Sequence, residues 1–520
     1  MNYLNTEDPY RLFQSAVNSE IFVDKSMLIS EISKVIGTNS RYVCITRPRR
    51  FGKSMNAQML GAFYTNGVDC SLLFENLKIA QVKDSQRHRN RYNVVFADMS
   101  RLPDVCNGYQ DYISAVIEGL REDLQEAYPQ LRGKKYSSVS QMFRDSQESF
   151  VFIFDEWDSV FGKDFMTDAD RNAYLTFLKN LLKDQPYVGL AYMTGVLPIA
   201  KYSSGSELNM FDEFHFMNDT VYDVYFGFSE EEVRGLCEKN PVTLTFDDLK
   251  EWYDGYFLCD GGSLFNPRSV VKALSRGTCL NYWTETGPMN EIADCIEHNT
   301  AAVREDIVKM VAGIPVEVEL EGYSASELQL NTRDEILSAM VVFGFLSYHD
   351  GYLRIPNREL MEKYQKILAR DSMGEVKEIV DSSKEMLTAT LAADQGKVAE
   401  ILERVHDREI PFLQYNDENA LSCVITLCYL YARKDYYIER EAKSGKGYCD
   451  YLFLPKKGGK PAIILELKVN DTCAAAIDQI KEKNYIAKAK ERARDILLVG
   501  ISYDQTKKRH DCVIEELFSS

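Results

Sequence analysis

The sequence contains no apolar run approaching the ~18 residues that a membrane-spanning helix needs. Its N-terminal stretch, MNYLNTEDPYRLFQ, has an acidic pair where a secretory signal would have basic residues followed by an apolar segment. The sequence also lacks the clustered cysteines and histidines of a zinc site or a disulfide framework. Its 12 cysteines include no CxxC pair, and its 6 histidines do not group with them. We therefore expect a cytoplasmic protein without a disulfide framework or a zinc site.

The composition is that of a folded globular chain with more than one core. Hydrophobic residues make up 45% and charged residues 27% of the 520 positions, which argues against disorder and against a fibrous fold. Single hydrophobic cores stop growing at roughly 250 to 300 residues. The length therefore predicts at least two domains.

The charge is unevenly distributed along the chain. The formal net charge is -18, yet residues 430–520 hold 18 Lys and Arg against 14 Asp and Glu. Nucleic-acid affinity is built largely by Lys and Arg side chains that neutralise phosphates. Any nucleic-acid partner is therefore expected to bind through the C-terminal half.

Short apolar runs alternate with helix-compatible stretches in the first half. Residues 41–46 (RYVCIT), 150–154 and 188–193 read as buried strands, and KSMNAQMLGAFY reads as a helix. Such alternation favours an α/β fold with a mostly parallel sheet that is covered by helices on both faces.

The second half divides into three predicted sections. From about Phe228 the sequence is helical and acidic, with a helix at Asp334–Val342 and a hairpin that turns at His349-Asp350-Gly351. A helix followed by a hairpin resembles a winged helix, although a packing subdomain that contacts no DNA is the preferred interpretation. After a helical connector, the order from Tyr436 is strand, hairpin, strand, helix (473–494) and strand (496–502). The predicted domains are 1–227, 228–365, 366–410 and 411–520.

A phosphate-binding loop is predicted between the first strand and its helix. Thr46-Arg-Pro-Arg-Arg-Phe-Gly-Lys-Ser54 has the strand, loop, GKS and helix order of a P-loop, with Thr46 where the first Gly usually stands. Backbone amides around Arg50 and Gly52 are expected to hold ATP phosphates, Lys53 to reach the β- and γ-phosphates, and Ser54 to bind Mg²⁺.

The apolar strand that ends in two acids supplies the second half of a nucleotide site. Asp155 is expected to hold Mg²⁺, and Glu156 to polarise the attacking water. A surface acidic pair at a strand end is the less favoured alternative. Thr194, which ends the third strand, is expected either to sense the γ-phosphate or to cap a helix.

A second group of charged residues lies around the C-terminal hairpin. Folding symmetrically about Gly458-Gly459 sets Asp450 opposite Leu467, to within one residue, while Glu466 and Lys468 share one face of a strand. Two carboxylates and one ammonium are what metal-dependent phosphodiester hydrolysis needs.

Two further residues are candidates for the same site. Glu441 is expected as an additional metal ligand, and Gln479, at the start of the following helix, as a contact of the phosphate or of the lysine. A solvated charged face is the alternative, but the apolar run AIILEL makes an unpartnered Glu466 costly to bury.

These residues resemble a family of bacterial proteins that join an N-terminal AAA-ATPase-like domain to a C-terminal PD-(D/E)XK nuclease-like domain. The resemblance implies nucleotide roles for Lys53, Ser54 and Asp155, and a nuclease core of Asp450, Glu466 and Lys468. The matching stretches are FVDKSMLI (22–29), ITRPRRFGKS (45–54), FIFDEWD (152–158), FGFSEEEV (226–233), WYDGYF (252–257), LFNPRSV (264–270), EAKSGKGYCD (441–450), ILELK (464–468) and IDQIKEKNY (477–485).

The expected function is an ATP-dependent nuclease that uses Mg²⁺, or Mn²⁺ at the carboxylate site, on DNA or RNA. Mobile-element and phage-defence roles are compatible with the resemblance. The alternative is an ATP-switch scaffold, or a nucleic-acid-binding protein, whose nuclease-like domain cuts nothing. A homo-oligomer that shares an arginine between neighbours is left open.

Overall fold

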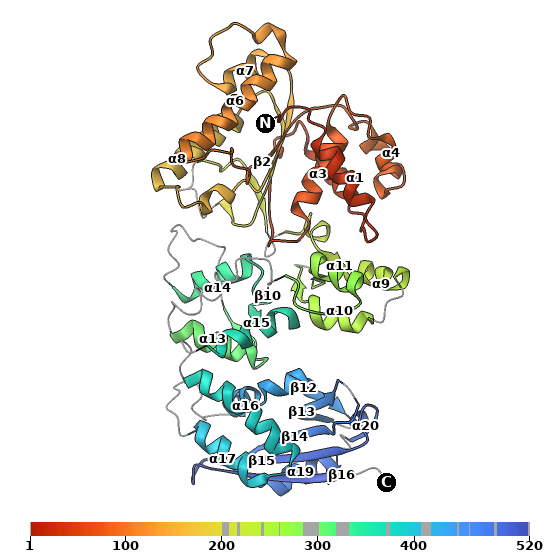
Figure 1. Ribbon diagram of the computed structural model, residues 1–520, viewed down its shortest axis with the longest axis vertical. Coiled ribbons are helices and arrows are strands. Elements are labelled where there is room, and N and C mark those ends of the chain that lie inside the picture. The colour runs from red at the N-terminus through yellow and green to blue at the C-terminus, as the bar shows by residue number, and fades with distance from the viewer. Residues whose placement is uncertain are drawn as a thin grey trace. The chain divides into compact units, whose positions relative to one another are not determined.

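The computed structural model describes residues 2–199, 207–215, 219–240, 244–258, 261–283, 301–318, 332–370, 375–406, 418–444, 447–456, 458–482 and 486–517. The chain forms two compact units (Figure 1). Unit 1 comprises Met1–Met289 and Glu317–Glu359, and unit 2 comprises Asn290–Val316 and Leu360–Ser520. The boundaries of the four predicted domains stay predictions.

Unit 1 is built on a five-stranded parallel sheet with the strand order β2-β3-β4-β1-β5. The central strands β1, β3 and β4 are buried along their whole length, as expected for a sheet covered on both faces. The strands are β1 (Tyr42–Thr46), β2 (Asn93–Asp98), β3 (Phe150–Asp155), β4 (Val188–Gly195) and β5 (Asp212–Phe214).

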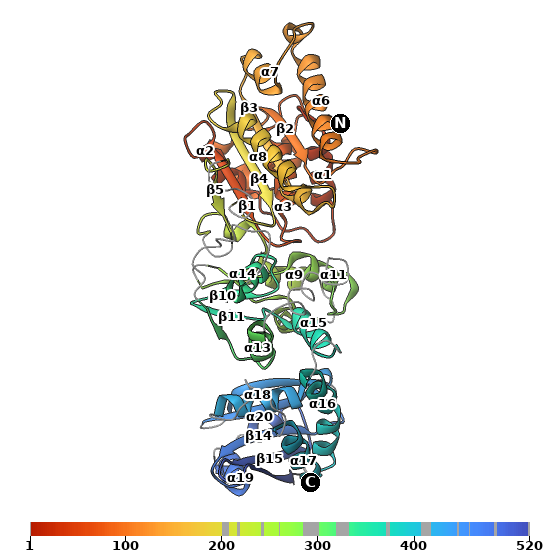
Figure 2. The same ribbon diagram turned by 90° about the vertical axis from the view of Figure 1, so that its left-hand side faces the viewer.

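Alternate residues of β3 enter two different hydrophobic cores. Phe150, Phe152 and Phe154 pack with helices on one face, and Val151 and Ile153 pack with helices on the other. The first face carries α6 (Tyr109–Ala127), α7 (Val139–Asp145) and α8 (Asp168–Leu182), and the second carries α1 (Asp8–Val17), α2 (Met27–Val35) and α3 (Lys53–Tyr64) (Figure 2). The predicted parallel sheet with helices on both faces is confirmed.

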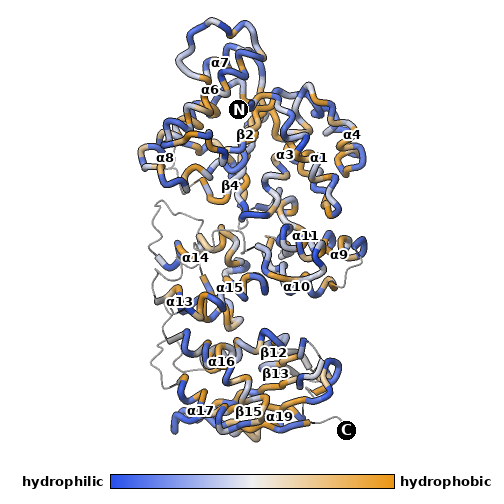
Figure 3. Tube along the Cα trace, in the orientation of Figure 1, coloured by the Kyte–Doolittle hydropathy of each residue, from blue (hydrophilic) through white to orange (hydrophobic). Residues whose placement is uncertain are grey.

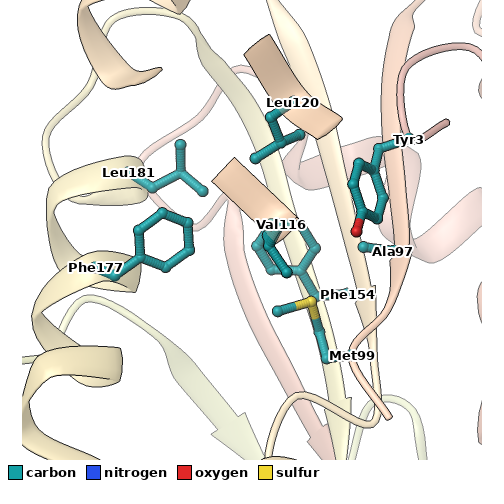
Figure 4. Close-up of a pocket in the computed structure, with 8 residues that line it drawn as sticks. All are labelled: Tyr3, Ala97, Met99, Val116, Leu120, Phe154, Phe177 and Leu181. Atoms are coloured by element: carbon teal, nitrogen blue, oxygen red, sulfur yellow. The ribbon is translucent and has the colours of Figure 1, made fainter. Parts of the chain in front are cut away.

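A small apolar cavity lies between the sheet, α6 and α8 (Figure 4). Its volume of about 10 Å³ is no larger than a single water-sized sphere, and its lining is apolar. Apolar cavities of this size stay dry, so this one is a packing defect and not a ligand site. Its lining residues are Tyr3, Ala97, Met99, Val116, Leu120, Phe154, Phe177 and Leu181.

The rest of unit 1 is a smaller helical section that follows the sheet. Three of its helices begin with a capping box, in which a Ser or Thr side chain and an acidic side chain satisfy the first amides reciprocally. The predicted helix and hairpin are confirmed as α14 and β10–β11. The elements are β6 (Phe228–Ser229), α9 (Glu230–Lys239), α10 (Phe246–Tyr253), β7 (Tyr256–Phe257), β8 (Ser263–Phe265), α11 (Pro267–Arg276), α14 (Arg333–Val342), β10 (Ser347–His349) and β11 (Tyr352–Arg354).

Unit 2 contains a five-stranded mixed sheet in sequence order, in which only the pair β14–β15 is parallel. Helix α19 (Cys473–Glu482) and α20 (Ile486–Lys490) pack on one face, and hydrophobic residues are concentrated in its strands (Figure 3). The other elements are α16 (Glu375–Leu391), α17 (Gln395–His406), α18 (Glu418–Cys428), β12 (Tyr436–Ser444), β13 (Gly447–Pro455), β14 (Ala462–Val469), β15 (Ile496–Asp504) and β16 (Arg509–Leu517).

The hairpin β13–β14 pairs one residue away from the predicted register. Tyr451 pairs with Leu465, so Asp450 continues opposite Glu466 and not opposite Leu467. The observed pairs are centred on Gly458, whereas the prediction placed the centre between Gly458 and Gly459. The difference is within the one residue that the prediction left open.

The helix predicted over residues 473–494 is wrong in its length. The chain forms α19, then the short α20, and residues 491 and 492 are already in a turn. Residues 483–485 lie outside the described residues, and the difference from the prediction is at the C-terminal end, because the described helix ends at Lys490 and not at 494. Gln479 is the seventh residue of α19, about two turns in, and not at its start.

The described residues contain no helix long and apolar enough to cross a membrane. Their other elements are α4 (Ser71–Phe74), α5 (Lys83–Gln86), α13 (Ala301–Val311), α15 (Arg358–Leu368), β9 (Val316–Glu317) and the 3-10 turns Lys78–Gln81, Pro129–Leu131, Ser159–Gly162, Asp223–Tyr225 and Leu430–Lys434.

Candidate functional site

The predicted phosphate loop connects the end of β1 to the first residue of α3, which is Lys53. The loop has two residues in the left-handed region, Arg50 with a φ of 76° and Gly52 with a φ of 89°. This conformation is strained for the arginine and natural for the glycine. Because α3 starts at Lys53, the first amides of the helix have no partner within the helix and point towards the loop. This is the arrangement that binds phosphate.

The Lys53 ammonium is buried inside its own loop. Its Nζ donates to the carbonyl oxygens of Arg47 and Pro48, each at 2.9 Å. Burial lowers the pKa of Lys53 to about 8, while the nearby carboxylates of Asp158 and Asp155 oppose this shift. The lysine is thus held by neutral carbonyls that a phosphate could replace.

Asp155 is the last residue of β3, and the loop follows β1. Both strands pair with β4 in the parallel sheet, so their carboxyl ends lie at the same edge. The Asp155 carboxylate is hydrogen-bonded to the Ser54 hydroxyl and accepts a second bond from the Thr194 hydroxyl. Burial raises its pKa, and these two bonds and the Lys53 charge work against the rise. Three residues that are far apart in sequence therefore meet at one edge of the sheet.

Glu156 follows directly and has a φ of 50°, an uncommon value for a residue other than glycine. Its amide donates to the Thr194 hydroxyl at 3.3 Å. Burial, followed by the charge of Asp155, raises the pKa of the Glu156 carboxyl. Thr194 thus holds both acids in place, and it caps no helix in this position.

Asp158 is a buried acid beside Lys53 that was missed from the sequence. Its carboxylate accepts from the amides of Val196 and Leu197, at 2.9 and 2.8 Å, and burial raises its pKa. The stretch FIFDEWD, which ends in this residue, was the signal that could have identified it.

The first arginine of the loop has a structural partner far along the chain. Arg47 is fully buried and forms an ion pair with Asp219, which is buried as well. Asp219 also accepts from the amides of Val221 and Tyr222. No local sequence signal joins residues separated by 172 positions, so this pair could not be predicted.

Side chains of the loop also pack against the helical section of unit 1. A Cβ added to Gly344, whose φ is 78°, would lie 2.8 Å from the Pro48 ring. Phe51 is fully buried, and its ring meets the Tyr256 ring edge to face at 4.9 Å. The non-glycine residues of the loop therefore serve as contacts to the helical section, which explains the departure from a glycine-rich loop.

Further cations gather near the loop. Burial, then the charge of Arg268 on α11, then that of Arg49, lowers the pKa of Arg50. The stretch LFNPRSV contains Arg268 and was the available sequence signal. Like charges brought together in this way favour an anionic ligand.

In unit 2, the hairpin brings the predicted nuclease residues together. The Leu467 amide donates to the Asp450 carboxylate at 2.7 Å, and the Asp450 amide lies 3.4 Å from the Glu466 carboxylate. On the same face, the Lys468 ammonium donates to Gln479 at 2.8 Å and lies 3.4 Å from Glu466. The Gln479 amide nitrogen donates to Glu466 in turn.

Glu466 is a buried acid of this group. Its side chain is 3% exposed, and burial, followed by repulsion from Asp450, raises its pKa to about 7. Lys468 opposes the shift. Paired carboxylates with an excess of negative charge are suited to a divalent cation, which would relieve their repulsion.

The predicted third metal ligand, Glu441, lies on β12, but its side chain is outside the described residues. Among the side chains that the structure does describe, no three His, Cys, Asp or Glu groups gather closely enough to hold a metal ion. The pair Asp450 and Glu466 nevertheless supplies hard oxygen donors, so the residues present fit a Mg²⁺ or Mn²⁺ ion.

Family comparisons agree with this division of the chain. Residues 13–204 match the model of a family described as a predicted AAA-ATPase, and residues 416–512 match that of the PD-(D/E)XK nuclease superfamily. The chain therefore carries an ATPase-like domain and a nuclease-superfamily domain, as the sequence motifs predicted.

Individual relatives are distant. A protein of Azotobacter chroococcum mcd 1, described as an uncharacterized protein in the vnfD 5'region, is 22% identical over 89% of this chain and 90% of its own length. The Walker-type ATPase PABY2304 of Pyrococcus abyssi is 12% identical, with a TM-score of 0.32 over 66% of this chain and 94% of its own. The ORC2 protein of Aeropyrum pernix is 12% identical, with a TM-score of 0.30 over 68% of this chain and 96% of its own.

Proposed function

We propose that the protein is an ATP-hydrolysing, metal-dependent nuclease in which nucleotide state controls a cleavage site formed by Asp450, Glu466 and Lys468. The observation that carries the proposal is the buried Glu466, whose pKa is raised to about 7 beside a second carboxylate and a lysine. A purely structural strand would place an apolar residue there, since an acid is costly to bury.

At the phosphate loop, the amides at the start of α3 and the Lys53 ammonium bind the ATP phosphates. Lys53 exchanges its two loop carbonyls for phosphate oxygens, which restores the charge that burial disfavours. Ser54 and Asp155 would hold the Mg²⁺ that accompanies ATP, and Glu156 orients and polarises the attacking water.

At the hairpin, Asp450 and Glu466 would hold the divalent cation, and the cation would lower the pKa of a bound water and stabilise phosphate charge. Lys468 presents its ammonium to the developing negative charge, and Gln479 keeps this ammonium on the correct side of the strand. Gln479 is thus a positioning residue as well as a candidate phosphate contact.

Incubation of the purified chain with plasmid, single-stranded DNA and RNA, with Mg²⁺ or Mn²⁺ and with or without ATP, tests the proposal. Metal-dependent cleavage that changes with nucleotide is the expected result. Chelation with EDTA and the Asp450→Ala variant are the controls for a contaminating nuclease. Nucleotide binding without cleavage under any of these conditions would contradict the proposal and leave the ATP-switch scaffold.

A further inference from the structure

One end of the unit 2 sheet gathers cations on aromatic rings. At the start of β12, the Tyr437 ring lies 5.2 Å from the Lys456 ammonium and 5.5 Å from the Arg492 guanidinium. Just before it, Lys434 lies 5.8 Å from the ring centre of Tyr431. Cations held over ring faces in this way are attracted by the ring quadrupole and are kept in fixed positions. We name Lys434, Lys456 and Arg492 the basic edge.

Two of the three cations, Lys434 and Arg492, are the exposed members of the basic edge. Neither has a carboxylate within ion-pair distance among the residues that the structure describes. Two acids near the start of β12 already have other partners, because Asp435 pairs with Lys460 at 2.6 Å and Glu439 pairs with Lys488.

The Lys456 ammonium is fixed by the backbone. It donates to the Arg433 carbonyl, and its own amide donates to the carbonyl of Asp435. In a chain with a formal net charge of -18, an ordered group of cations at one place marks a surface for an anionic partner.

Tyr437, whose ring has Lys456 and Arg492 over it, lies on the same face of the sheet as the proposed cleavage site. Tyr437 pairs with Leu454, and both pack into the core on the sheet face that carries α19. Because side chains alternate along a strand, Asp450 lies on this same face of β13 as Leu454. Four residues of strand separate Leu454 from Asp450, which is about 13 Å at 3.3 Å per residue.

We propose that the basic edge binds the sugar-phosphate backbone of the nucleic acid that is cut at Asp450 and Glu466. This inference rests on the proposed nuclease function and adds the surface that holds the substrate. The stretch of about 13 Å along β13, from Leu454 beside Tyr437 to Asp450, corresponds to about four nucleotides at 3.4 Å each, which places the edge on one side of the cleaved bond. Contacts of this type fix position and do not read sequence.

Binding of fluorescent oligonucleotides of random sequence to the full chain, measured by anisotropy in EDTA over a range of salt concentrations, tests the proposal. The variant is Lys434→Gln/Arg492→Gln. The matched control is Lys134→Gln/Lys135→Gln, which removes two exposed cations from unit 1. At ~0.1 M salt the variant is expected to bind at least tenfold more weakly, with a salt slope smaller by roughly 1.4 to 1.8, as two lost phosphate contacts require.

Equal affinity and slope in the variant and the control would overturn the proposal. So would a change in the sedimentation of the variant without nucleic acid, because the edge would then hold an acidic surface of a second copy. The Asp450→Ala variant is expected to keep its affinity in EDTA and to lose cleavage when Mg²⁺ is added. Loss of cleavage alone thus tests the nuclease function, and loss of affinity alone tests the basic edge.

Discussion

The phosphate site of unit 1 and the carboxylate site of unit 2 use the same kinds of residue in different electrostatic situations. In the first, burial lowers the pKa of Lys53 to about 8 and also raises the pKa of Asp155, Glu156 and Asp158. In the second, burial and a neighbouring carboxylate raise the pKa of Glu466 to about 7. The first site therefore suits a phosphate beside its lysine together with a cation beside its acids, and the second gains from a cation alone.

The two sites also differ in how the chain assembles them. The phosphate site takes residues from the start of α3, which follows β1, and from β3 and β4, so that Ser54, Asp155 and Thr194 meet only after three parallel strands have aligned. The carboxylate site is made by one hairpin and the helix that follows it. A substitution in unit 1 should therefore perturb distant elements more readily than one in unit 2.

The largest expected effect is on cleavage, and it distinguishes the role of Asp450 from that of Lys468. Asp450→Ala should reduce cleavage on the order of 10³-fold and weaken metal binding, because it removes a carboxylate donor. Lys468→Ala should reduce cleavage comparably while metal affinity changes little, since an ammonium does not ligate the ion. Calorimetric Mn²⁺ titration beside a cleavage assay distinguishes them. Equal losses of metal affinity would show that the residues form a structural cluster.

In unit 1, Glu156→Gln should separate turnover from binding. A carboxylate that polarises water contributes roughly 10²- to 10⁴-fold to a rate, whereas contacts of phosphate and Mg²⁺ with the loop are unaffected. We expect ATP hydrolysis to fall by this factor with little change in ATP affinity, measured by phosphate release and by fluorescent-nucleotide titration. Glu148→Gln, which changes an exposed acid two residues before the same strand, is the control. If affinity collapses together with turnover, the role of Glu156 is structural.

Removal of the loop lysine should mainly affect nucleotide affinity. Hydrogen bonds to a charged group are worth about 1.5 to 3 kcal/mol, which corresponds to a loss of roughly 10- to 150-fold for Lys53→Ala. Titration with a fluorescent ATP analogue measures the loss. Metal binding at the hairpin should be unchanged in the same variant, and unchanged ATP affinity would refute the phosphate-loop assignment.

The raised pKa of Glu466 predicts a stability that depends on pH. Because the pKa is about 7 in the folded chain and 4.5 for a model carboxyl, folding favours the protonated acid. The resulting stability is fully present below about pH 4.5 and is lost as the pH rises through about 7. Without metal, the wild type should lose on the order of 2 kcal/mol relative to Glu466→Gln between about pH 5 and 8. Denaturant titrations in EDTA test this, and parallel pH dependences would contradict it.

The smallest expected effect concerns the contact between the phosphate loop and the helical section. Gly344→Ala adds a methyl group against the Pro48 ring in a left-handed position, with an expected cost of about 1 to 2 kcal/mol. We expect a several-fold change in ATP affinity, because Lys53 and Pro48 belong to the same loop. Gly351→Ala is the matched control, since its φ is 83° and no atom lies within 4 Å of the added Cβ. Identical ATP affinity in the two variants would show that the contact does not reach the nucleotide.

Much of the fold could be predicted because short-range patterns determine it. The stretch KSMNAQMLGAFY forms α3, and the turn at Asp350-Gly351 joins β10 to β11, as their local sequences indicate. One error concerns the end of an element. The predicted helix over 473–494 was too long, because the described helix ends at Lys490 and the chain turns at residues 491 and 492 towards β15.

The sequence by itself determined which charged residues follow the apolar strands. The alternation of side chains along a strand and the residue types of the next loop are local properties. Only the tertiary structure decided that β4 lies between β1 and β3, that Asp219 forms an ion pair with Arg47, and that the Pro48 ring packs against Gly344. These contacts join segments that are far apart along the chain. Their energies depend on burial and on neighbouring charges, which are set only when the whole core has formed.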